Sequence, residues 1–188
     1  MKNSGYSFFL FLILALSQPS VARAQQDSSR QNPGYIHLGG HLALPLGNMI
    51  GEYKLLLGSA IQIDFPVKQR VVFLTVNAAY QELIRENKAS SSLKNPKILP
   101  LKVGLKFFPV EQIYLQADLG ASFVLNKTHA SFDRTAVLVF SNELGYRVAI
   151  PGGNVAEAGL VFHRNAAFIA DGSSHSFFGI KLSFGFAY

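Results

Sequence analysis

The sequence predicts an all-β fold, an eight-stranded antiparallel up-and-down transmembrane β-barrel. Apolar and polar residues alternate with a period of two along eight segments. Each segment has about ten residues or more, enough for a tilted strand to cross a bilayer, whereas strands of soluble sheets average nearer five or six. The connections are alternately short and long, as in barrels with tight periplasmic turns and longer outer loops.

The first element is a secretory signal peptide, predicted over residues 1–24. Lys2 precedes the apolar run "FFLFLILAL" at residues 8–16, and Ala22, Arg23 and Ala24 follow with the small-x-small spacing of a cleavage site. A membrane anchor or a buried helix is the alternative. The apolar run is far shorter than the ~20 residues of a membrane-spanning helix, so we favour the signal.

The composition of the remaining chain fits one exported domain. Cysteine is absent, so neither disulfides nor thiol chemistry contribute, and packing and hydrogen bonds must provide the stability. Loss of Lys2 and Arg23 with the signal lowers the formal net charge from +6 to +4. The basic residues are scattered without a run, so we expect no nucleic-acid partner.

The elements of the mature chain follow in order. Residues 25–33, "QQDSSRQNP", are polar and predict a flexible N-terminal segment, and residues 34–188 form the barrel domain. The predicted strands are residues 35–44, 55–65, 71–80, 98–108, 113–125, 135–146, 154–164 and 176–188. The short turns are residues 66–70, 109–112 and 147–154, and the longer outer loops are residues 45–54, 81–97, 126–134 and 166–175.

The alternation gives each strand one apolar and one polar face. Residues such as Leu101, Leu182 and Phe184 are assigned to lipid. An eight-stranded barrel is only wide enough to be filled by side chains, so we expect a packed, non-conducting lumen. The residues assigned to it are His37, His41, Gln62, Asp64, Thr75, Asn77, Lys102, Lys106, Gln116, Asp118, Glu143, Glu157 and Lys181.

Folding the short turns predicts a lumen charge cluster of Lys102, Asp118, Glu143, Glu157 and Lys181. Lys102 is expected opposite Asp118, and Glu143 opposite Glu157, with Lys181 neutralising the two facing carboxylates from the next strand. The cluster is either a satisfied set of core charges or a general acid/base pair. We favour the first interpretation because a narrow lumen gives a substrate no access.

Other positions allow fewer conclusions. His37 and His41 share a face, but residues four apart on a strand are separated by about 13 Å, too far to share one metal ion. We therefore expect no metal and no cofactor. Asn142 falls on the lipid face and Phe73 on the lumen face, which indicates either a bulge or a position near a rim.

The signal peptide, the strands "IYLQADLGASFVL" and "SNELGYRV" and the final "KLSFGFAY" resemble small bacterial outer-membrane β-barrel proteins, the porin-like family of the OmpA/OmpX type. Tyr188 stands where that family usually ends in Phe. The resemblance implies a Gram-negative outer-membrane location, contact with lipids and lipopolysaccharide, and recognition of the last strand by the barrel-assembly machinery. It also implies a structural or adhesive role in the cell envelope, with any surface ligand bound by the outer loops.

Two alternatives remain open. The segment "LVFHRNAAF" is similar to the His-x-Ser-Asn motif of outer-membrane lipid A deacylases, which implies His163 as base and Asn165 as oxyanion donor. No serine fills the nucleophile position, and Arg164 could instead contact a lipopolysaccharide phosphate. The other alternative is a soluble lipid-carrier barrel, which would turn its apolar face inward.

Overall fold

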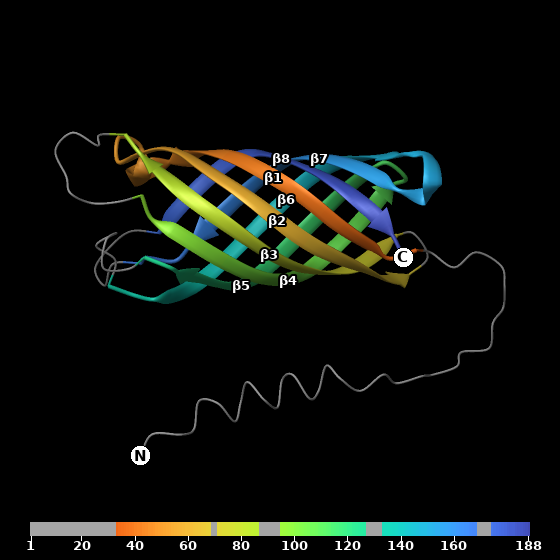
Figure 1. Cartoon of the computed structure of the whole chain (residues 1–188), viewed down its shortest axis with the longest axis horizontal. Coiled ribbons are helices and arrows are strands. Elements are labelled where there is room, and N and C mark those ends of the chain that lie inside the picture. The colour runs from red at the N-terminus through yellow and green to blue at the C-terminus, as the bar shows by residue number, and fades with distance from the viewer. Residues whose placement is uncertain (1–32, 69–70, 87–94, 127–132, 169–173) are drawn as a thin grey trace, which may run out of the picture. The chain divides into compact units, whose positions relative to one another are not determined.

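The computed structural model describes residues 33–68, 71–86, 95–126, 133–168 and 174–188, and these form one closed antiparallel barrel (Figure 1). The predicted signal peptide and nearly all of the predicted N-terminal segment lie outside the described residues. Parts of three predicted outer loops and of the predicted turn at residues 66–70 do as well. The all-β, eight-stranded, up-and-down prediction is confirmed for the barrel domain.

Eight strands follow one another around the barrel, each paired with the next. They are β1 (Tyr35–Leu46), β2 (Tyr53–Lys68), β3 (Val72–Arg85), β4 (Lys97–Val110), β5 (Ile113–Val124), β6 (Ala136–Ala149), β7 (Val155–Asn165) and β8 (His175–Ala187). Two short 3₁₀ helices, η1 (Gly47–Met49) and η2 (Pro151–Gly153), lie in connections. Among the described residues, no helix has the length and hydropathy to cross a bilayer.

The barrel closes where β1 meets β8. Their ladder runs from Tyr35 opposite Ala187 to Leu46 opposite Ser176. The backbone N–H of Tyr188 then donates to the carbonyl of Gly34, at 3.1 Å. Each strand is therefore paired on both sides, and no unpaired backbone edge has to face hydrocarbon.

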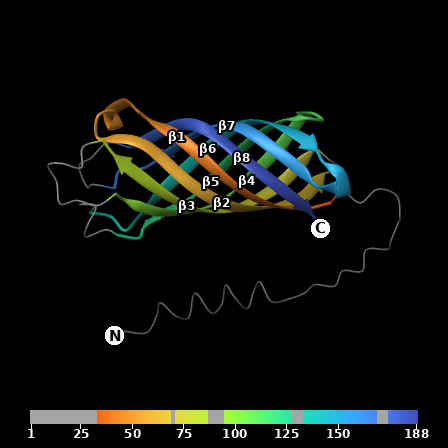
Figure 2. The ribbon, with the colours of Figure 1, turned by 45° about the horizontal axis from the view of Figure 1, so that its top comes forward.

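The two rims differ as the connection lengths predict. The ends of β2, β4 and β6 turn tightly into β3, β5 and β7 at the rim where β8 also ends, which is the right-hand end in Figures 1 and 2. Gly152 and Gly153 in the β6–β7 turn have φ of 83° and 79°, values that favour glycine. By the pattern of such barrels this rim is periplasmic.

Several strands are longer than the sequence predicts. β2 begins at Tyr53 instead of residue 55, and β3 continues to Arg85 instead of residue 80. Tyr53 pairs with Arg85, with a register shift before Leu55. Backbone pairing thus extends past the end of the clear alternation, and the connection that follows β3 is shorter than predicted.

The apolar side chains face outward and the charged ones inward. Leu101 and Leu182 are 45% and 59% exposed, whereas Lys106 and Glu157 are 0% and 4% exposed. This confirms the predicted orientation. The alternative of a soluble lipid carrier requires the opposite orientation, so the structure contradicts it.

The lumen has three layers along its axis. Near the outer rim lies an apolar cap, made of Ala43, Met49, Tyr53, Leu56, Leu83, Ile98, Val124, Val137, Phe168 and Phe177. Near the periplasmic rim lies an aromatic cluster of Phe73, Phe108 and Tyr114, with Tyr35 packed against it. Phe73 is therefore a lumen residue near the rim. The layer between the cap and the aromatic cluster is polar.

Candidate functional site

The strand registers place the predicted charge cluster differently from the sequence prediction. Lys102 pairs with Gly120 instead of Asp118, displaced by the register shift between Phe107 and Val110. The predicted facing of Glu143 and Glu157 is also wrong. Glu143 pairs with Val161, and Glu157 pairs with Arg147. The physical reason is that β6 continues to Ala149 and η2 moves the centre of the turn further along the chain.

The periplasmic network gathers His37, Asp64, Lys106, Arg147 and Glu157. Lys106 Nζ lies 2.6 Å from Asp64 Oδ2 and 3.0 Å from Glu157 Oε2. His37 Nε2 lies 3.1 Å from Asp64 Oδ2. Arg147 Nε donates to Glu157 Oε1 at 2.8 Å, and Arg147 Nη2 donates to Asp64 Oδ2 at 3.3 Å. Two cations therefore bridge the same two carboxylates.

The guanidinium of Arg147 also stacks on the aromatic cluster. Its central carbon lies 4.3 Å from the ring centroid of Phe108, 4.8 Å from that of Tyr35 and 5.3 Å from that of Phe73. A planar, weakly hydrated guanidinium can bond carboxylates with its edge while its faces contact rings. Arg147 thus joins the aromatic cluster to the periplasmic network.

The central network is centred on Lys181 and Lys102. Lys181 Nζ donates to Glu143 Oε2 at 2.8 Å, and Tyr114 Oη donates to Glu143 Oε1. Lys102 Nζ donates to Ser141 Oγ at 2.8 Å and lies 3.9 Å from Asp118 Oδ2. Hydrogen bonds from Thr75, Gln116 and Ser141 satisfy the Asp118 carboxylate. The five residues of the predicted cluster therefore lie in two networks instead of one row.

These networks are balanced in charge. The four carboxylates Asp64, Asp118, Glu143 and Glu157 meet the four cations Lys102, Lys106, Lys181 and Arg147. The ligand atoms of His37, Asp64 and Glu157 lie within 4.8 Å of one another, a separation compatible with a metal ion. The Lys106 ammonium already bonds both carboxylates, so a metal would have to displace it.

His163 and Asn165 both face the lumen. His163 is 4% exposed, and its Nε2 has no hydrogen-bond partner among the described residues. Asn165 is fully buried and accepts a hydrogen bond from Ser122 Oγ at 2.6 Å. Ser141, which sequence reasoning did not single out, lies opposite His163 on β6. Its hydroxyl is bonded to Lys102 and Asp118.

A small internal cavity borders His163. Its volume is about 30 Å³, and it is lined by polar groups of His41, Gln81, Lys102 and Lys181 as well. Such a space holds roughly one water molecule. Gln81 Nε2 and His41 Nε2 lie 2.9 Å apart in its lining, so His41 belongs to this region and not to the network around His37.

Sequence reasoning missed the role of four residues in the periplasmic network. His37, Asp64 and Lys106 were assigned to the lumen face, but the alternation does not tell which of the lumen residues meet across the barrel. The sequence predicts Arg147 in a turn and not as a lumen cation. The strand β6 in fact extends past it, which brings its guanidinium over Glu157.

Comparison with known proteins identifies the fold. No family model matches the chain, and no curated protein matches it. Among solved structures, the outer-membrane enzyme PagL is similar, with TM-score 0.54 and 9% identity over 78% of this chain and 97% of that one. Ail, the attachment invasion locus protein of Yersinia pestis, is similar with TM-score 0.54 and 13% identity over 84% of this chain and 100% of that one.

The structure of Ail with the heparin analogue sucrose octasulfate also matches, with TM-score 0.53 and 13% identity over 83% of this chain and 100% of that one. These identities show the fold alone. Together with the apolar wall and the charged interior, the fold is that of a small eight-stranded β-barrel of the bacterial outer membrane.

Proposed function

We propose that the protein is an integral outer-membrane barrel with a non-conducting lumen, whose structural or surface-interaction role is carried by its outer loops. One observation supports this most: the lumen is filled from the apolar cap to the aromatic cluster, and its charges are paired. A filled lumen leaves the outer rim and the wall as the surfaces available for function. Ail, the attachment invasion locus protein, shares the fold.

The partners follow from this arrangement. Lipids and lipopolysaccharide surround the wall, and Arg164, exposed at the outer end of β7, is placed for a lipopolysaccharide phosphate. The barrel-assembly machinery would read the last strand, whose Phe184, Phe186 and Tyr188 are exposed. A surface ligand would be bound by the connections at the outer rim.

Two measurements test the proposal. Purified protein in a planar bilayer should give no stable open-channel current, and a steady conductance would contradict the packed lumen. Cells that carry variants with exchanged outer loops should keep the barrel, seen as a mobility shift on boiling, and should lose attachment to host cells or matrix. Unchanged attachment across all four loop exchanges would contradict the surface role.

A lipid A acyl hydrolase is a second candidate function, because the neighbouring strand places Ser141 opposite His163. The Ser141 hydroxyl donates to Asp118, so it would have to turn toward His163 to act as a nucleophile. The outer-membrane enzyme PagL shares the fold. Both side chains face the lumen, so an acyl ester would have to enter it. Mass spectrometry of lipid A from cells with and without the protein tests this, and an unchanged spectrum would contradict it.

A further inference from the structure

Asn142 places a polar amide on the lipid-facing side of the barrel. The sequence offers a bulge or a position near a rim as explanations, and the bulge is excluded because the ladders on both sides of β6 continue through Asn142 without a register shift. Asn142 pairs with Ala117 on β5 and with Phe162 on β7. Its side chain is exposed, on the same face as Phe140 and Leu144.

Asn142 also lies far from both rims. It is six residues from Ala136 and seven from Ala149, the two ends of β6. With a rise of about 3.3 Å per residue and a tilt of about 40°, these separations are about 15 and 18 Å along the barrel axis. The apolar band of such a barrel is about 25 Å tall, so the amide lies near the middle of the hydrocarbon.

The amide lacks a partner at this depth. Within the described part of the chain, Asn142 makes no side-chain hydrogen bond. Lipid esters and headgroups lie at the membrane interfaces, so lipid cannot satisfy the amide either. A polar group left unbonded in hydrocarbon is costly, and polar side chains inside membranes commonly hold membrane proteins together.

We propose that the protein forms a two-fold symmetric homodimer through the outer face of β5, β6 and β7, with the Asn142 amides of the two copies bonded to each other. Two copies inserted in the same direction are related by a two-fold axis along the membrane normal, so equivalent residues of the two copies lie at the same depth in the bilayer. A residue next to that axis contacts the same residue of the partner copy. The amide both donates and accepts, so two copies of Asn142 can exchange reciprocal hydrogen bonds.

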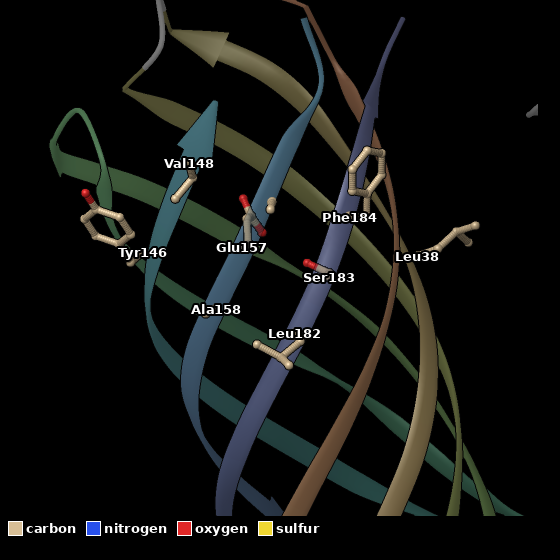
Figure 3. A pocket seen from close by; sticks show the side chains of 9 residues that line it. Leu38, Tyr146, Val148, Glu157, Ala158, Leu182, Ser183 and Phe184 are labelled. Atoms are coloured by element: carbon tan, nitrogen blue, oxygen red, sulfur yellow. The ribbon is translucent and has the colours of Figure 1, made fainter. Parts of the chain in front are cut away.

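The shape of the same face supports close contact. Ala117 and Ala121 lie beside β6 on β5. On the other side, Ala158 of β7 forms the floor of a groove between Tyr146 of β6 and Leu182 of β8 (Figure 3). Two shallow, open depressions along this face have volumes of about 360 and 430 Å³. Small residues let two membrane-spanning surfaces approach, and the grooves can receive large apolar side chains of the partner.

The test uses the folded mature protein and its freedom from cysteine. Sedimentation equilibrium in detergent micelles gives the dimer dissociation constant of the unchanged protein, of Asn142→Leu and of the control Ser59→Ala, a lipid-facing polar residue on β2. In phosphatidylcholine vesicles, a short bifunctional thiol reagent is applied to Asn142→Cys and to the control Ile61→Cys, at mid-strand on the opposite wall. A mobility shift on boiling confirms that each variant is folded.

We expect Asn142→Leu to weaken the dimer about tenfold, equivalent to ~1.4 kcal/mol, and Ser59→Ala to leave it unchanged. We expect dimer cross-linking for Asn142→Cys and none for Ile61→Cys. The proposal is overturned if the unchanged protein is monomeric at every concentration, if Asn142→Leu binds as tightly as the unchanged protein, or if the two cysteine variants cross-link equally.

Discussion

Lys106 and Asp64 form a fully buried ion pair inside the barrel, with Lys106 Nζ 2.6 Å from Asp64 Oδ2 and both side chains at 0% exposure. Buried charges are tolerated only when paired and hydrogen-bonded. Lys106 meets this requirement with Asp64 and Glu157 together, and Arg147 reinforces both contacts. Together with Arg147 and Glu157, the pair therefore connects β2, β4, β6 and β7 across the lumen.

Replacement of Lys106 by Met should lower the free energy of unfolding by about 3–5 kcal/mol, because two buried carboxylates lose a shared cation. Urea unfolding in lipid vesicles, followed by the mobility of the folded band, measures this. Lys54→Met is the matched control, since Lys54 is exposed at the start of β2. Equal losses in both variants would show that the buried network does not stabilise the barrel.

Replacement of Arg147 by Lys should lower the free energy of unfolding by about 1–2 kcal/mol although the charge is kept. Lysine cannot contact Phe108 and Tyr35 with a planar face while it bonds Glu157. The same unfolding assay measures the loss, with the exposed Arg134→Lys as control. A neutral result for Arg147→Lys would mean that charge alone accounts for the role of Arg147.

Replacement of Gly145 by Ala should destabilise the barrel by about 1–3 kcal/mol. Gly145 lies opposite Tyr114, and an added methyl group would overlap the Tyr114 ring, which packs across the backbone of Gly145. Gly40→Ala is the control, because the nearest atom to its new methyl would be the Gly58 carbonyl oxygen, 3.4 Å away. Unfolding of the two variants side by side gives the difference, and equal stabilities would contradict the steric role.

Replacement of His163 by Leu should change the free energy of unfolding by no more than about 1 kcal/mol, because Nε2 has no hydrogen-bond partner to lose among the described residues. Asn165→Leu should cost about 1–3 kcal/mol, because it leaves the Ser122 hydroxyl unpaired. If lipid A hydrolysis is detected, its loss in the folded His163→Leu variant would identify a chemical role. A large loss of stability in that variant would instead indicate a structural one.

Much of the architecture could be predicted from the sequence because a membrane barrel imposes one simple rule on each strand. Whether a residue such as Leu101 or Lys106 faces lipid or the lumen follows from its odd or even position along the strand alone. The register of neighbouring strands does not follow from this alternation, because it depends on the geometry of the turn that joins them. The turn that contains Gly152 shifts the partner of Glu143 by four residues, and no local pattern signals such a shift.

The sequence therefore predicts which residues lie in the candidate site, but not which of them bond to one another. Lys102, Asp118, Glu143, Glu157 and Lys181 all face the lumen, yet their partners include residues on strands far apart in the chain. Lys181 of β8, for example, bonds Glu143 of β6 and Gln62 of β2. Arg147 lies where alternation fades into a turn, so sequence reasoning could not distinguish a lumen cation from a solvated turn residue.

The seam between β1 and β8 has a consequence for biogenesis. The residues that pair across it stand more than one hundred positions apart in the chain, so this ladder can form only when all the intervening strands are in place. Loss of β8 would leave the edges of β1 and β7 open together, so the cylinder cannot be completed without this strand.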